Sequence, residues 1–187
     1  MNTTEAEYKL SYVRRNNMPV VSLVDIDNAS DEVKVAVKQH LADGHTITNE
    51  KRTLLHNVPA FWALEGKSYE MSAELKKFVT ARAAALFEYA ISVENDCLVC
   101  TTYYKKFYES LGIDIDNVQY TPEEELVIEY ARAIVKDRKN VPEELFDRLK
   151  KRFGEEGLIV LTTMGMFMIA NNYFNDILHV QSEFLEK

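Results

Sequence analysis

Cys97 and Cys100 are the residues whose type and spacing are best suited to chemistry, and they are the only two cysteines in the chain. A separation of three residues places both sulfurs on one face of a helix. Such a pair is either a redox-active dithiol or half of a metal site. Because two cysteines cannot staple a secreted domain of this size, the spacing favours catalysis or metal binding over a structural disulfide.

The residues just before the pair predict where the reactive thiol lies. Asn95 and Asp96 form a break, and Asp96 is expected to cap a helix that begins near Cys97. The positive end of the helix dipole favours a thiolate there. Because the Asp96 carboxylate opposes a thiolate at Cys97, Cys100 is predicted to have the lower pKa, and Cys97 is predicted to resolve its sulfenic acid as a disulfide.

Three other interpretations of the cysteine pair are a zinc site, a thioredoxin fold and two buried structural cysteines. A zinc site needs two more ligands, and the histidines show no His-x3-His or Cys-His spacing near the cysteines. A thioredoxin fold would need flanking strands and a small turn residue where Leu98 and Val99 stand. Two buried structural cysteines remain an alternative, since free cysteine packs well as a small apolar residue. The four histidines are His40, His45, His56 and His179.

Composition restricts the class of protein. The chain has 187 residues and 47% apolar content, which fits one soluble domain. The net charge of -8, without a block of basic residues, argues against a nucleic-acid partner. We expect no secretory signal and no membrane span, and therefore a cytoplasmic location.

The order of elements predicts an all-α fold behind an N-terminal arm. The arm covers residues 1–29, with a short helix over 8–15 and an extended stretch over 18–24, and the helical domain covers 30–187. No alternating strand pair joined by a hairpin turn is found. Helices are expected to follow the caps Ser30, Thr48 and Thr121, and another is expected to start at Pro142. The other expected elements are a turn over 60–64 ended by Gly66, a long helix over 72–93, a helix over 97–112 and an apolar stretch over 158–178.

The cysteine segment and its surroundings resemble the carboxymuconolactone decarboxylase and AhpD-type alkylhydroperoxidase superfamily. The resemblance covers roughly residues 30 to 180 and implies an AhpD-like helical bundle. It further implies a cofactor-free enzyme in which the second cysteine attacks a peroxide and the first resolves it. The segments that carry the resemblance are 52–59, 90–100, 108–114, 121–135, 153–161 and 171–176.

The sequence departs from this family at two positions. The peroxidase members carry a Glu twelve residues before the first cysteine and a His four residues after the second, where this chain has Ala85 and Tyr104. Tyr104 keeps helical phase with the cysteines and is expected either to stabilise a thiolate or orient a substrate, or to be a core aromatic. Glu88 and Glu94 are the candidate substitutes for the missing acid, with Glu88 the stronger.

The first hypothesis is a thiol-dependent peroxidase or disulfide oxidoreductase with Cys97, Cys100 and Tyr104 as site residues. Its partners would be a small-molecule peroxide or disulfide and an external dithiol reductant. The alternatives are a decarboxylase-like non-redox enzyme and a non-catalytic helical scaffold. The resemblance and an apolar, Met-rich segment over 158–170 also predict a homo-oligomer, a trimer or a multiple of one.

Overall fold

A computed structural model describes residues 18–185, and within this range the secondary structure is helical with no strand. The all-α prediction is confirmed, while the short helix expected over 8–15 lies outside the described residues. The helices are α2 (Asp31–Ala42), α3 (Asn49–Leu54), α4 (Val58–Phe61), the π-helix η1 (Trp62–Gly66), α5 (Lys67–Leu75), α6 (Ala81–Glu94), α7 (Leu98–Ser110), α8 (Pro122–Lys136) and α9 (Glu143–Ile177).

Helix starts follow the capping chemistry of the sequence. The Ser30 and Thr48 side chains accept hydrogen bonds from backbone amides at the starts of α2 and α3. Thr121 and Glu124 form a complete capping box at the start of α8. These caps satisfy backbone donors that have no partner inside the helix. The predicted starts at these three positions are therefore confirmed.

Two predicted boundaries between residues 60 and 93 are wrong. Gly66 does not end a helix, because the chain runs from α4 through the π-helix into α5 without a break. The helix expected over 72–93 is instead divided between α5 and α6. Leu75 and Val79 are both buried, and Thr80 caps α6 by accepting the Ala83 amide at 3.1 Å. The chain therefore forms a turn between α5 and α6 and not a continuous helix, because the turn buries Leu75 and Val79 and places Thr80 as the cap of α6.

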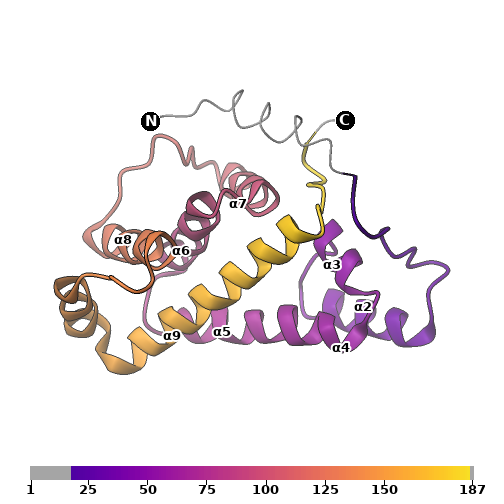
Figure 1. The fold of residues 1–187 in the computed structure, drawn as a ribbon, viewed down its shortest axis with the longest axis horizontal. Helices are drawn as coiled ribbons and strands as arrows, with labels where there is room; N and C mark the ends of the chain where they lie inside the picture. Colours follow the sequence, from indigo (N-terminus) through magenta and orange to yellow (C-terminus); the bar gives the residue numbers. More distant parts are fainter. Residues whose placement is uncertain (1–17, 186–187) are drawn as a thin grey trace.

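The main hydrophobic core lies among α5, α6, α8 and α9, with Tyr108 of α7 completing it. Figure 1 shows α9 running diagonally between the α6, α7 and α8 group and the shorter helices α2 to α4. Gly154 interrupts α9 with φ 71° and ψ 178°, a backbone conformation that only glycine adopts readily. The kink redirects the second part of α9 along the core.

Two smaller clusters complete the packing. One is formed by α2, α3 and α4, and the other contains both cysteines with Val99 and Val180. Phe174 of α9 packs against both clusters and so joins them. The described part of the N-terminal segment lies on this side, where the Val20 amide donates to the Leu178 carbonyl at 3.0 Å.

Helix α9 is also the one described helix that is long and apolar enough, by length and composition, to cross a membrane. The expectation that no stretch approaches a membrane span therefore does not hold for α9. Buried core helices meet the same criterion, and Leu161, Met164 and Met168 of α9 lie in the main core. A location in the cytoplasm stays a prediction.

Candidate active site

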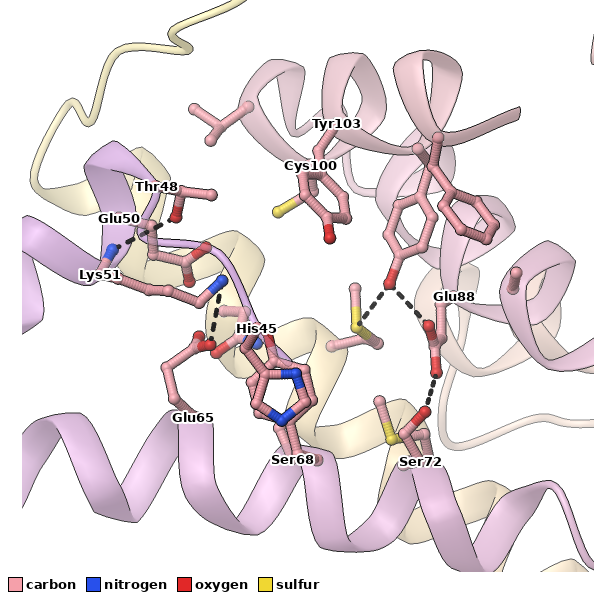
Figure 2. Close-up of a pocket in the computed structure, with 18 of the residues that line it drawn as sticks. His45, Thr48, Glu50, Lys51, Glu65, Ser68, Ser72, Glu88, Cys100 and Tyr103 are labelled. Atoms are coloured by element: carbon pink, nitrogen blue, oxygen red, sulfur yellow. Dashed lines mark hydrogen bonds and ion pairs between the residues drawn. The ribbon is translucent and has the colours of Figure 1, made fainter. Parts of the chain in front are cut away.

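A cavity of about 400 Å³ lies between α7 and the helices α3 to α5. One wall is formed by the helices α6 and α7 and carries Cys100, Tyr103, Tyr104 and Glu88. The opposite wall carries charged and polar side chains of α3, η1 and α5 (Figure 2). Helix α9 closes the space with methionines and Asn171. Cys100 and Tyr104, both predicted site residues, therefore face one space.

The two cysteines have different positions relative to the cavity. Cys97 is the N-cap residue of α7 and is 0% exposed, whereas Cys100 lies at the end of the first turn, 7% exposed, and lines the cavity. The predicted cap at Asp96 is wrong, since Asp96 adopts a left-handed φ of 60° just before the cap position. A molecule in the cavity meets the Cys100 sulfur first, with Cys97 behind it.

The predicted low pKa of Cys100 is contradicted. The hydrogen bond with the Cys97 thiol, and then burial, hold the pKa of Cys100 well above its ordinary value. The Asn175 amide donates to the Cys100 sulfur at 3.3 Å, and Asn172 also favours the charged form, but these contacts do not offset burial. A helix dipole contributes only about 0.3–1 kcal/mol at such a position. Cys100 is therefore a thiol at rest and needs a base before it can attack.

Tyr104 is hydrogen-bonded to a buried acid, Glu88, in the cavity wall. Its hydroxyl donates to Glu88 Oε2 at 2.7 Å, and the Ser72 hydroxyl donates to Glu88 Oε1 at 3.3 Å. Burial raises the pKa of Glu88, while the hydrogen bonds from Tyr104 and Ser72 lower it by less. Burial likewise raises the pKa of Tyr104 well above its usual value. Tyr104 and Glu88 are therefore a buried hydroxyl group and a buried acid joined by one hydrogen bond.

Of the two candidate acids, Glu88 and Glu94, only Glu88 lies in the cavity wall. Ala85 lines the cavity and contributes only a methyl group to its wall. Glu88, one turn further along α6, supplies the carboxylate that faces the site. Glu94 is not part of the cavity wall and pairs with Lys136 at 3.5 Å.

A buried ion pair lies on the opposite wall. Lys51 Nζ is 3.5 Å from Glu65 Oε2, and both side chains are 6% exposed. Burial lowers the pKa of Lys51, but Glu65 and Tyr69 raise it by more, so this lysine stays charged. Glu65 reaches the pair from the π-helix, a distortion that is often found at functional sites. His45 stacks on Tyr69 at 3.6 Å between ring centroids and extends this wall.

Glu50 on the same wall has a carboxylate oxygen, Oε1, that is buried and has no hydrogen-bond partner within residues 18–185. Glu50 as a whole residue is partly exposed, so the burial concerns the Oε1 atom. Burial, followed by the charge of Glu65, raises the pKa of Glu50 to about 8. A carboxyl group with such a pKa exchanges protons near neutral pH.

Metal binding receives no support from the described side chains. No group of three or more His, Cys, Asp and Glu residues in the described part of the chain is arranged to hold a metal ion. His40, one of the histidines weighed as a ligand, is buried in the α2 to α4 cluster, and burial lowers its pKa to about 4. It is a neutral core residue.

The sequence pointed to one wall of the site and missed the other. Glu50, Lys51, Glu65 and Tyr69 lie in or near short helices whose spacing carries no recognisable motif. A weak signal was available: the 49–54 helix is mostly polar, so one polar face had to be buried if the helix packed at all. Which face of α3 is buried depends on how α3 packs against the rest of the chain.

Comparison of the chain with protein-family models and with curated proteins gave no match.

Proposed function

We propose that the protein is a thiol-dependent peroxidase or disulfide oxidoreductase that uses Cys100 and Cys97. One observation carries the proposal: Cys100 faces a cavity that also holds charged and polar side chains, while its partner thiol lies buried behind it. In a purely structural pair neither sulfur would need to face a cavity. The order of contact assigns attack to Cys100 and resolution to Cys97.

The chemical steps balance with a peroxide and a dithiol. The Cys100 thiolate attacks the terminal oxygen of a hydroperoxide, the O–O bond breaks, and Cys100 becomes a sulfenic acid while an alkoxide leaves. The proton lost by Cys100 ends on the alkoxide, giving an alcohol. The Cys97 thiol then attacks the sulfenic sulfur, which releases water and forms the disulfide. An external dithiol reduces this disulfide and is itself oxidised to a disulfide.

Tyr104 and Glu88 support the first step by hydrogen bonding. Burial raises the pKa of Glu88 above its ordinary value and so favours the protonated carboxyl group. In that form Glu88 donates to the Tyr104 oxygen, and the Tyr104 hydroxyl is released to donate to the oxygen that becomes the alkoxide. Buried, oriented donors of this kind stabilise developing negative charge.

The test is intact mass after oxidation. Wild type treated with one equivalent of cumene hydroperoxide and then with an alkylating reagent should be two mass units lighter and unalkylated, because a Cys97–Cys100 disulfide has formed. Cys97→Ser should retain an oxidised Cys100, and Cys100→Ser should remain fully alkylatable after unfolding. With dithiothreitol as the reductant, wild type should consume peroxide catalytically.

The double variant Cys97→Ser/Cys100→Ser gives the background reaction between dithiothreitol and peroxide, and circular dichroism checks that each variant is folded. Wild type that keeps both thiols and consumes peroxide no faster than the double variant would refute the proposal. In that case the cysteines are core packing, and the scaffold or non-redox alternatives take its place.

A further inference from the structure

We propose that Glu50 accepts the proton of the Cys100 thiol and later returns it to the alkoxide. The inference rests on the proposed function for its second half, but the proton exchange between Glu50 and Cys100 is a property of the resting protein. Nothing in the spacing of the sequence suggests it, because Glu50 belongs to α3 and Cys100 to α7.

The geometry of the cavity brings the two groups together. Figure 2 shows the Cys100 sulfur and the Glu50 carboxylate on facing sides of the same space, with no labelled side chain between them. Asn175 of α9 links them, since its amide donates to the Cys100 sulfur at 3.3 Å and also interacts with the Glu50 carboxylate. A proton can pass between them through bridging water, for which the cavity has room.

Of the acids Glu50 and Glu65 on this wall, Glu65 is held in an ion pair and Glu50 is not. Glu65 is held by the Lys51 ammonium, whereas Glu50 Oε1 has no hydrogen-bond partner among the described side chains and backbone groups. A buried, unpaired carboxylate oxygen is costly and calls for an explanation. The groups that act on its charge from the surrounding elements are Lys51 of α3, Glu65 of η1, Cys100 of α7, Asn175 of α9 and Glu183 of the C-terminal segment.

In this proposal the two groups titrate as a pair. Glu50 has a pKa of about 8, and Cys100 titrates above its ordinary range. Once the pair has lost its first proton, the remaining proton lies mainly on sulfur and for a small fraction of the time on Glu50. That fraction of thiolate does not change with pH until the second proton leaves. The carboxylate–thiol and carboxyl–thiolate forms carry the same total charge, so no external acid or base is required.

The experiment measures the alkylation rate of Cys100 by iodoacetamide from pH 6 to 10 in the Cys97→Ser background. With Glu50 present, the rate should rise about tenfold between pH 6 and 7, about fivefold between pH 7 and 8, and less than about threefold between pH 8 and 9. With Glu50→Gln the flat region should vanish, and the rise between pH 8 and 9 should be about tenfold. Glu94→Gln is the matched control, because Glu94 lies outside the cavity and pairs with Lys136, and it should keep the flat region.

A flat region that persists unchanged in Glu50→Gln would overturn the inference. Circular dichroism checks folding, and Glu50→Asp, which retains a carboxyl group, should keep the flat region. Peroxide consumption is measured separately with both cysteines present, where Glu50→Gln should lower the rate by about 10²- to 10⁴-fold. Loss of the flat region without peroxide turnover in wild type would refute the peroxidase proposal and leave the Glu50–Cys100 exchange standing.

Discussion

At the scale of single residues, the site pairs a tyrosine, Tyr104, with a buried acid, Glu88. A histidine titrates near neutral pH by itself, whereas tyrosine has a reference pKa of about 10. Burial moves the Tyr104 hydroxyl further from neutrality, so Tyr104 serves as a hydrogen-bond donor and not as a base. Burial raises the pKa of Glu88 above its ordinary value and that of Glu50 to about 8, so Glu50 is the carboxyl group that titrates near neutral pH.

Tyr104→Phe tests this division of roles. The variant removes the donor to Glu88 without changing the shape of the ring, so we expect peroxide turnover to fall roughly 10²-fold. Disulfide formation between Cys97 and Cys100 should still reach completion at long times. Stopped-flow measurement of peroxide consumption gives the rate, and intact mass gives the end point.

Tyr120→Phe is the matched control, because Tyr120 lies in the segment before α8, is partly exposed and is not part of the cavity wall. Equal rates for Tyr104→Phe and wild type would show that Tyr104 is only a core aromatic, the alternative that the sequence left open.

At the scale of elements, the kink in α9 decides what the cavity contains. The second part of α9 supplies Met164, Met168 and Asn171 to the cavity wall and Asn175 to the Cys100 sulfur. These residues reach the site only because the helix changes direction at Gly154. The backbone conformation of Gly154 thus affects which side chains of the second part of α9 line the cavity.

Gly154→Ala should therefore destabilise the fold. A φ of 71° with ψ 178° costs a non-glycine residue about 1–3 kcal/mol. No neighbouring atom lies within 4 Å of the position that the new methyl group would occupy, so the cost is one of backbone conformation and not of crowding. Urea unfolding followed by circular dichroism should show a lower midpoint with an unchanged slope.

Lys151→Ala, a substitution at an exposed position in the first part of α9, is the comparison variant and should change stability by less than about 0.5 kcal/mol. A Gly154→Ala protein as stable as this comparison variant would show that the chain can straighten α9 at no cost, and the kink would then not be needed to build the site.

At the scale of the whole molecule, one face of α9 is left apolar and uncovered. Ile159, Met166, Tyr173 and Ile177 are 66%, 54%, 54% and 68% exposed. The first three are seven residues apart and the fourth lies four further on, so all four share one face of the helix. Exposed apolar patches of this kind mark interaction surfaces.

We propose that a second copy of the chain covers this face, and we expect a homo-oligomer, a trimer or a multiple of one. Light scattering coupled to size-exclusion chromatography should give a multiple of the 21.6 kDa chain mass in detergent-free buffer. The double variant Ile159→Lys/Met166→Lys should give the chain mass, because two desolvated charges cannot be buried at an apolar contact without partners.

Val35→Lys is the control for the oligomer, since Val35 is an exposed apolar residue on α2, away from this face, and its replacement should leave the assembly intact. Wild type that elutes as a monomer at all concentrations would contradict the proposal.

The sequence by itself determined the fold class, most helix starts and one wall of the site. Helix starts depend on local chemistry, as at Thr121 and Glu124, where two side chains satisfy the first amides of α8. The spacing of Cys97, Cys100 and Tyr104 on one helix is equally local, and Cys100 and Tyr104 do face one cavity.

Only the tertiary structure decided the electrostatics and the second wall. The pKa of Cys100 depends on burial and on Cys97, and these outweigh the helix dipole that the sequence suggested. Glu50 and Cys100 are fifty residues apart by their numbers and meet because α3 and α7 enclose one cavity. Desolvation and contacts between distant segments are properties of packing, and no spacing along the chain encodes them directly.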